Sequence, residues 1–304
     1  MSQGALQSQL IGNQFNSRLQ KILRRSLSLA IALPLLLSSS ATSEEIEFSD
    51  AAERMRELSD GPIQLRLTYG SNAETWSGEL RYEVFYNGKR EIEQTQESSL
   101  YGAASLQDLD ADGVAEVIIR TYSGGAHCCT THTIHSWQGD RFTTTDTGFR
   151  DGEGGSFQDL DGDGQLEFVS VDNAFLYAFS SYAGSFPPSQ IWTLQNGQFV
   201  DVTRQHPEEL RAIANQMREA VLTIQSDTNE VNGILAGYVA QMILLGKQEQ
   251  GWAFMLANYD RTSDWGLEIY EGERAIGRHP GFPAALKAFL IEQGYLTADG
   301  SAAP

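Results

Sequence analysis

The chain has 304 residues with 40 acidic side chains and 21 Lys or Arg, which gives a formal net charge of −19. Such acidity opposes binding to nucleic acid or to anionic membranes, since both need basic protein surface. It is typical of a soluble protein that attracts divalent cations. The length allows one large domain or two small ones, each with its own core.

The first 41 residues have the pattern of an export signal. Four basic residues up to Arg25 precede an apolar run at 27–37, and small residues follow at 38–41. The run is too short to span a bilayer, which needs about 20 apolar residues, and no membrane span is expected in the mature chain. We expect cleavage after Ala41 and a periplasmic or secreted protein, with an uncleaved N-terminal anchor as the alternative.

Residues 42–60 are interpreted as a short helix or a linker. Asp50 and Glu53 have the spacing of a helix capping box, and Met55 and Leu58 would then face inward. A flexible linker is equally consistent with this composition.

The pattern of residues 61–204 indicates a β-domain. Apolar and polar residues alternate at 63–69, which predicts a strand with one buried face. Asn87 and Gly88 predict a hairpin turn within 80–93. The other expected strands and hairpin turns lie at 117–122, 138–140, 168–171 and 195–197.

Two acidic loops in this region share one spacing, with acids at the first, third, fifth and ninth positions and Gly at the sixth. Calcium takes about six to eight oxygen ligands, and alternate residues of a short loop can direct carboxylates to one point. Magnesium fits less well because it keeps its waters. The predicted calcium ligands are Asp108, Asp110, Asp112 and Glu116 in the first loop and Asp159, Asp161, Asp163 and Glu167 in the second.

An EF-hand is excluded, because its loop needs an acid at the twelfth position and helices on both sides. These loops have Ile119 and Ser170 there, and both continue into β-branched, strand-like runs. Solvated acidic turns without an ion are the alternative. Acids held in one register repel one another unless a cation lies between them, so we expect an ion in at least one loop.

With Leu106–Gln107 and Phe157–Gln158 before them, the loops resemble the FG-GAP/VCBS class of calcium-binding repeats. In that class such loops join strands of β-propeller blades, so the resemblance implies blade-like sheets with bound calcium. The loops begin 51 residues apart, at Asp108 and Asp159, about the length of one blade. The Phe-Gly and Gly-Ala-Pro signatures of the class are missing, and Glu stands at position nine where Asp is common. Residues 61–204 hold at most three units, too few for a closed propeller.

The chain's two cysteines, Cys128 and Cys129, are adjacent, with His127, His132 and His135 nearby. In an exported protein thiols oxidise, and with only the neighbour as partner a vicinal disulfide is the first interpretation. A zinc or copper site is the second, although the spacing matches no standard zinc finger and His132 and His135 would point to opposite faces of a strand. Two reduced, buried cysteines are the third.

From residue 205 the apolar period becomes helical. Apolar stripes predict helices near 207–224, 231–245, 252–259 and 284–293, which together form a helical domain over 205–297. The small residues at 298–304 are expected to be disordered. The predicted fold class is therefore α+β, an antiparallel β-domain of two to three blade-like repeat units followed by a small C-terminal helical domain.

No motif for a nucleophilic serine, a zinc protease, a phosphate-binding loop or a dinucleotide is present in the sequence. We expect an exported, non-enzymatic calcium-binding protein that recognises an unknown protein or carbohydrate ligand. The alternative is an exported thiol-redox or zinc/copper protein centred on the His-Cys-Cys segment. A hydrolase that uses two acids distant in sequence is a third interpretation. Asp146, Asp151 and Glu153 could complete a ligand shell or stay solvated.

Overall fold

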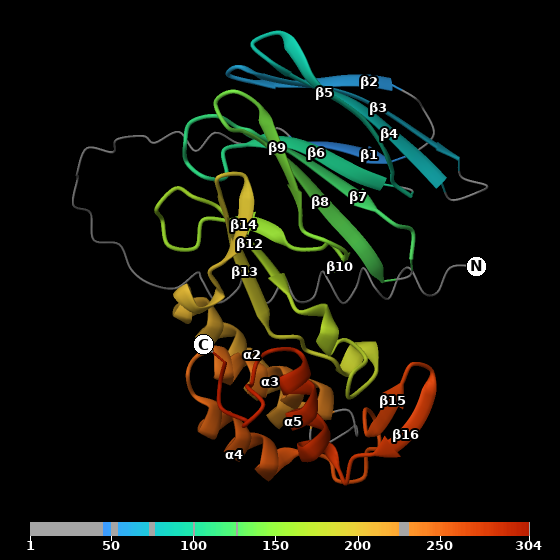
Figure 1. Cartoon of the computed structure of the whole chain (residues 1–304), viewed down its shortest axis with the longest axis vertical. Coiled ribbons are helices and arrows are strands. Elements are labelled where there is room, and N and C mark those ends of the chain that lie inside the picture. Colours follow the sequence, from blue (N-terminus) through green and yellow to red (C-terminus); the bar gives the residue numbers. More distant parts are fainter. Residues whose placement is uncertain are drawn as a thin grey trace, which may run out of the picture. The chain divides into compact units, whose positions relative to one another are not determined.

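Antiparallel sheets, four α-helices and three short 3-10 helices make up the regular structure of the described residues, which confirms the expected α+β class (Figure 1). The computed structural model describes residues 45–49, 54–72, 77–99, 101–125, 127–224 and 231–303, all within the unit Ser43–Pro304. The export signal expected over 1–41 and the capping box of Asp50 and Glu53 lie outside the described residues.

The first sheet is a four-stranded antiparallel meander in which each strand pairs with the next. Its strands are β2 (Arg54–Asp60), β3 (Ile63–Asn72), β4 (Ser77–Tyr86) and β5 (Lys89–Glu97). One face of β3 is buried, as the alternation at 63–69 predicts. Strands β4 and β5 are joined at Asn87 and Gly88, with φ of 48° and 78°, the left-handed backbone that a tight hairpin turn requires. Both predictions are confirmed.

The structure corrects the helix or linker expected over 42–60. In the described part of this segment, β1 (Glu45–Ser49) pairs with β6, and β2 pairs with β3. Met55 is 74% exposed whereas Leu58 is 3% exposed, because residues three apart in a strand point to opposite faces. The pairing partners lie elsewhere in the chain, so the local pattern could not show them.

Two further sheets repeat one arrangement. The central sheet contains the meander β6 (Tyr101–Gln107), β7 (Glu116–Tyr122), β8 (Cys128–Trp137) and β9 (Phe142–Asp146), with β1 beside β6 and β10 (Arg150–Asp151) beside β8. The third sheet is the meander β11 (Ser156–Gln158), β12 (Glu167–Val171), β13 (Ser189–Gln195) and β14 (Gln198–Asp201). In each meander an acidic loop joins the first two strands. Both sheets therefore contain a four-stranded antiparallel meander with an acidic loop between its first two strands.

The central sheet is buried on both faces, as β7 shows. Val117 and Ile119 pack against the β2–β5 sheet in one core cluster. Ile118 points the other way, into a smaller cluster that includes Leu194 of β13. Figure 1 shows the three sheets as successive layers, with β12 and β13 leading toward the helices.

The C-terminal helices surround one apolar core. They are α2 (Pro207–Ile224), α3 (Val231–Leu244), α4 (Gln248–Asn258) and α5 (Phe282–Glu292), which confirms the four predicted helices. Helix α3 is buried along nearly its whole length and is the centre of this core. The hairpin of β15 (Glu268–Glu271) and β16 (Arg274–Arg278) lies between α4 and α5 and was not expected, because its residues are mostly exposed and show no buried face.

The borders of the predicted regions also change. Phe175 and Phe179 fall within the span assigned to the β-domain, yet they pack in the helical core. The segment expected to be disordered after residue 297 is instead ordered through residue 303: the Thr297 amide donates to the Ser301 carbonyl at 2.8 Å, and Arg204 donates to the Ala303 carbonyl at 2.9 Å. None of the described helices is long and apolar enough to cross a membrane.

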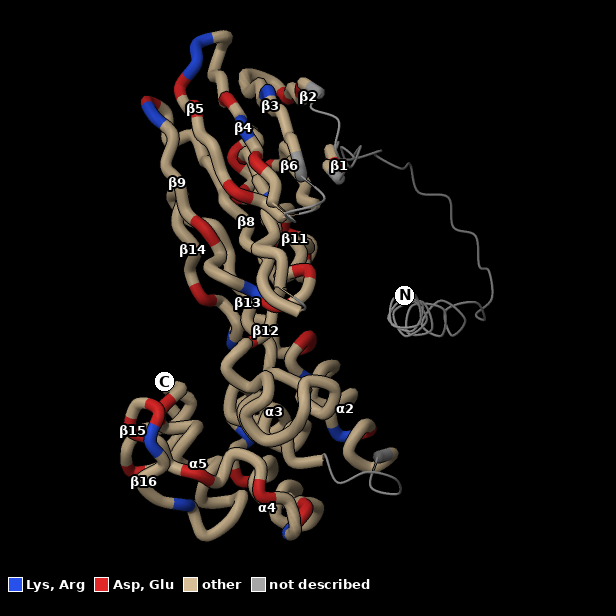
Figure 2. Tube along the Cα trace, turned by 90° about the vertical axis from the view of Figure 1, so that its right-hand side faces the viewer, with Lys and Arg blue, Asp and Glu red and all other residues tan. Residues whose placement is uncertain are grey.

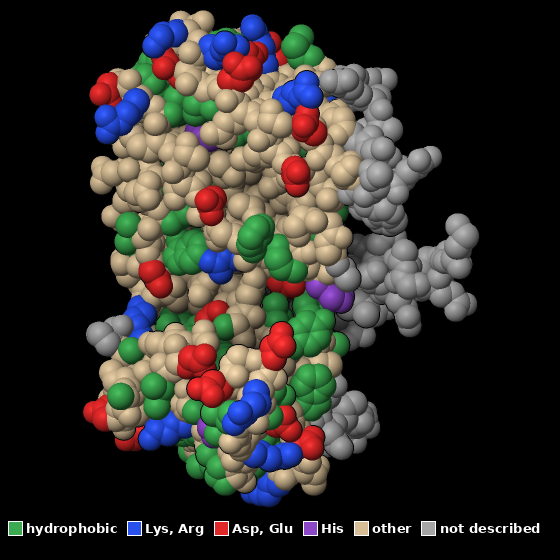
Figure 3. Space-filling view, turned by 45° about the vertical axis from the view of Figure 1, so that its right-hand side comes forward, with side chains coloured by type: hydrophobic (Ala, Val, Ile, Leu, Met, Phe, Trp, Pro, Cys, Tyr) green, Lys and Arg blue, Asp and Glu red, His purple; other side chains and the backbone are tan. Residues whose placement is uncertain are grey.

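Charged residues of both signs are interspersed along the described trace (Figure 2) and are intermixed on the face of the molecule drawn in Figure 3. Exposed ion pairs such as Arg66–Glu57 and Arg90–Glu83 join neighbouring strands, and pairs of this kind stabilise a fold by about 0–1 kcal/mol. Two acids of the described chain differ because they are buried: Glu116 and Glu167 are 1% and 4% exposed. Both stand at the ninth position of an acidic loop.

Candidate metal centre

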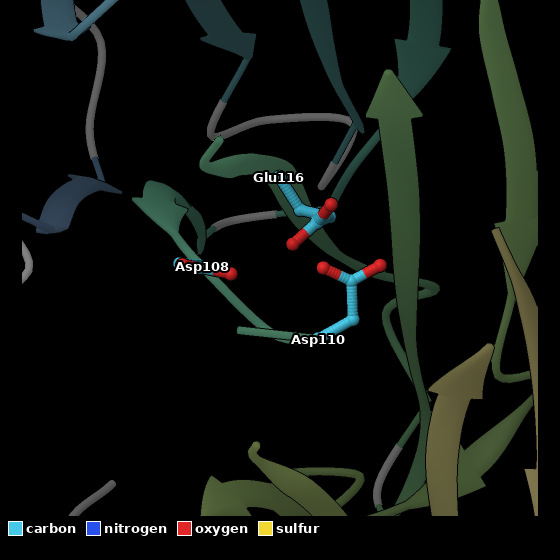
Figure 4. A group of neighbouring side chains, drawn as sticks. All are labelled: Asp108, Asp110 and Glu116. Atoms are coloured by element: carbon cyan, nitrogen blue, oxygen red, sulfur yellow. The ribbon is translucent and has the colours of Figure 1, made fainter. Parts of the chain in front are cut away.

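The β6–β7 loop brings three of its four predicted ligands together. Carboxylate oxygens of Asp108, Asp110 and Glu116 lie within 4.8 Å of one another. Figure 4 shows the carboxylates of Asp110 and Glu116 facing each other, with Asp108 on the same loop beside them. Asp112 is exposed and is not part of this group.

The loop holds this shape through hydrogen bonds from its own amides to its own carboxylates. Asp108 Oδ2 accepts from the Gly113 amide at 2.9 Å, and Asp112 Oδ1 accepts from the Val114 amide at 2.7 Å. Ala111 and Gly113 have positive φ values of 61° and 87°, which turn the backbone twice. These contacts use one oxygen of each acid, and Asp108 Oδ1 remains buried with no hydrogen-bond partner among the described residues.

Glu116 enters the loop from the start of β7 and is fixed by two donors. Its Oε2 accepts from the Leu109 amide at 2.7 Å, and its Oε1 accepts from the Ser136 hydroxyl of β8 at 3.0 Å. Burial, followed by the negative charges of Asp110 and Asp112, raises the pKa of Glu116 to about 8, although both hydrogen bonds act in the opposite direction. Burial also raises the pKa of Asp110. A bound cation would reverse these shifts by stabilising the ionised carboxylates.

The β11–β12 loop has the same hydrogen-bond register. Asp159 Oδ2 accepts from the Gly164 amide at 3.3 Å, Asp163 Oδ1 accepts from the Gln165 amide at 2.8 Å, and Glu167 Oε2 accepts from the Leu160 amide at 3.0 Å. Its converging ligands differ, however: they are Asp159, Asp161 and Asp163, all exposed, without Glu167. Each loop thus unites three of the four residues predicted for it.

The two loops are linked directly. The Leu166 amide in the second loop donates to the Leu109 carbonyl in the first at 2.9 Å. Leu109 is fully buried in the cluster between the central and third sheets, and Leu166 packs against that cluster. The loops therefore form one end of the interface between the two repeated sheets.

The Cys-His segment forms no common centre. Cys128 and Cys129 are joined by a disulfide, and His127 stacks on Tyr182 with ring centroids 4.3 Å apart. His132 packs edge-on to Phe168 of the third sheet, with ring centroids 5.2 Å apart.

His135 lies on the opposite face of β8, where its Nε2 is 2.9 Å from the Tyr82 hydroxyl of the first sheet. The predicted divergence of His132 and His135 is therefore observed. Among the described residues, groups of three or more potential ligands converge only at the two acidic loops.

The three other acids singled out near the second loop have structural contacts instead. Asp146 accepts from the Gly148 amide at 2.8 Å, the Tyr182 hydroxyl donates to Asp151, and Glu153 lies 3.0 Å from Arg120. None joins either acidic group. Ser136, which supports Glu116, was missed by sequence reasoning, because only the pairing of β7 with β8 brings it near the loop.

Comparison with known proteins gives one family match and two relatives. Residues 210–294, in the helical region, match the family described as the sll0997 C-terminal domain. The chain is 42% identical over 204 residues to the "Probable thylakoid lumen protein sll0997" of Synechocystis sp., an alignment that covers 64% of this chain and 60% of that protein. It is 32% identical over 194 residues to the uncharacterized protein y4bJ of Sinorhizobium fredii, an alignment that covers 60% of this chain and 30% of that protein. The chain thus spans less than two thirds of either relative. No solved structure matches it.

Proposed function

We propose that the protein is an exported, non-enzymatic module that binds calcium in its β6–β7 loop and, more weakly, in its β11–β12 loop. The observation that carries the proposal is the convergence of Asp108, Asp110 and Glu116 in a partly buried loop. Three carboxylates at this separation repel one another strongly where water is partly excluded. A divalent ion between them removes that repulsion and supplies a partner for Asp108 Oδ1.

Calcium fits the donor set better than a transition metal does. All converging side-chain donors are carboxylate oxygens, and neither thiolate nor imidazole takes part. The ion would hold the crossover between β6 and β7 and, through the Leu166–Leu109 hydrogen bond, the neighbouring loop. Its role in this proposal is structural: the ion neutralises the loop carboxylates and fixes the loop backbone.

The resemblance to FG-GAP/VCBS repeats is part of the proposal. It is supported by two matching meanders, each with its acidic loop between the first and second strand. Export is supported by the leader pattern at 1–41 and by the name of the Synechocystis relative, a probable thylakoid lumen protein. Calcium sites of modules outside the cytoplasm commonly bind with dissociation constants of about 0.1–1 mM.

The test is a calcium titration of the chain without residues 1–41, by calorimetry and by thermal melts in chelator or in about 5 mM calcium. At that concentration we expect stabilisation of about 1–2 kcal/mol. Asp110→Asn should remove most of it, since it keeps the loop's hydrogen-bond acceptor but deletes a charge. The matched control is Asp140→Asn, an exposed acid in the β8–β9 turn, which should respond like the parent. An equal melting temperature with calcium and with chelator in the parent protein would overturn the proposal.

A further inference from the structure

A cavity of about 280 Å³ lies between the central sheet and β11, apart from both acidic groups. Its walls come from five strands, β1, β6, β7, β8 and β11, and from the residue just before β11. The residues used in the argument below are Glu45, Ser105, Gln107, Arg120, His132 and Phe157.

The cavity exists because β11 is short. Residues of β6, β7 and β8 that share one face of the central sheet point toward the third sheet, and Arg120 and His132 are direct register partners on that face. Strand β11 has three residues, and only Phe157 among them packs against the small core that joins the sheets. Its ring meets the His132 ring edge-on at 6.1 Å and forms one wall. Beyond this wall, Ala103, Ser105 and Gln107 of β6 line the cavity.

Two buried polar atoms in the lining have no hydrogen-bond partner among the described residues. They are Arg120 Nε and His132 Nδ1. His132 is 6% exposed, and a buried polar group without a partner destabilises the fold unless something in the cavity satisfies it. Both atoms therefore point to an occupant, either solvent or a bound molecule.

The charges of the lining select the chemistry of that occupant. Arg120 is already paired with Glu45 at 3.6 Å and with Glu153 at 3.0 Å. Burial, with the nearby Arg120 charge, lowers the pKa of His132 to about 4, so its ring is neutral near pH 7. The lining thus carries no surplus positive charge for an anion, and Arg120 repels a cation.

We propose that this cavity binds a neutral, hydroxyl-rich molecule of monosaccharide size. A hydroxyl both donates and accepts, so a set of hydroxyls can match a donor such as Arg120 and an acceptor such as Glu45 at once. Ser105 and Gln107 offer both functions, and the Phe157 ring offers an apolar wall for the C–H face of a sugar ring. The inference is independent of the calcium proposal, because it requires no ion in the loops.

The experiment titrates the chain without residues 1–41 with D-glucose, D-galactose, D-mannose and D-xylose, using saturation-transfer NMR and calorimetry. Acetate and succinate serve as anionic probes. Every titration is run in calcium and in chelator. We expect saturable binding of at least one sugar and no saturable binding of either anion.

Two variants assign the binding to the cavity. Ser105→Leu fills it, and His132→Phe keeps the aromatic packing but removes the unpartnered nitrogen. Each should weaken sugar binding about tenfold or more. Ser59→Leu is the matched control, since Ser59 is exposed on β2, in the sheet that does not border the cavity, and should bind as the parent does.

Three results would overturn the inference: binding of none of the four sugars, which leaves a solvent-filled cavity; equal sugar affinity in the parent and in Ser105→Leu; or preferential binding of an anion. Thermal melts and circular dichroism of each variant establish that it folds. If Ser105→Leu does not fold, the sugar affinity of His132→Phe alone tests the inference. If no sugar binds but the melting temperature still depends on calcium, this inference is wrong and the calcium proposal stands.

Discussion

The two acidic loops have the same sequence spacing and share four internal hydrogen bonds in the same register, yet they gather different acids in different surroundings. In the β6–β7 loop the ninth residue, Glu116, joins the group and is held by a serine from the adjacent β8 strand. In the β11–β12 loop the group is made of three exposed aspartates, and Glu167 supports only the backbone. Spacing therefore determines the turn, whereas neighbouring strands determine which carboxylates meet and how strongly they interact.

The largest expected effect of this difference is on pH dependence without calcium. Glu116 has a folded pKa of about 8 against 4.5 as its ordinary value, so the folded state binds more protons between these limits. The stability that this group contributes is present in full below pH 4.5 and is lost as pH rises through 8, by up to about 5 kcal/mol. Urea unfolding in chelator from pH 5 to 8 measures this loss.

Glu116→Gln should flatten that pH profile, since it removes the titrating group, and calcium should flatten it in the parent. Glu167→Gln is the control from the second loop and should keep the parent's slope. If Glu116→Gln and the parent lose stability equally from pH 5 to 8, the contrast between the loops is wrong as stated.

The next effect is on stability at pH 5 in chelator. Glu116→Ala leaves the Leu109 amide and the Ser136 hydroxyl without their acceptor and should destabilise the fold by about 2–4 kcal/mol. Glu167→Ala leaves only the Leu160 amide and should cost about 1–2 kcal/mol. Denaturant unfolding of both variants tests the ranking, and the reverse order would show that β8 does not support the first loop.

The sequence alone predicts the features that depend on neighbouring residues, but not those that depend on distant strands. The hairpins at Asn87 and near 195–197 and the four helices depend on residues close in the chain, and those predictions are confirmed. The form of residues 54–60 depends on pairing with β3, so a local helix pattern was misleading. The different roles of Glu116 and Glu167 depend on Ser136 and on burial between sheets, which no spacing rule contains.

A smaller effect is expected in calcium affinity. Asp110→Asn and Asp161→Asn each delete the third-position charge, and both side chains keep the acceptor for an amide two residues later. The partly buried first loop should lose about tenfold or more in affinity, because charge interactions there are less screened, and the exposed second loop should lose less. Calorimetric titration of each variant compares them. Equal losses would mean that burial does not distinguish the two sites.

The smallest expected effect concerns the fourth residue of each loop, Ala111 in the first and Gly162 in the second. Ala111 adopts φ of 61° in the first loop, where the second loop has Gly162 with φ of 82°. A left-handed backbone costs a residue with a Cβ about 1–2 kcal/mol, which glycine avoids, although glycine loses more entropy on folding. Ala111→Gly should therefore stabilise the first loop by about 0.5–1 kcal/mol, and Gly162→Ala should destabilise the second by a similar amount. A thermal melt of the double variant is the control, since the two changes exchange the residues between loops and should nearly cancel. Destabilisation by Ala111→Gly would indicate that the first loop tolerates alanine through contacts that the second loop lacks.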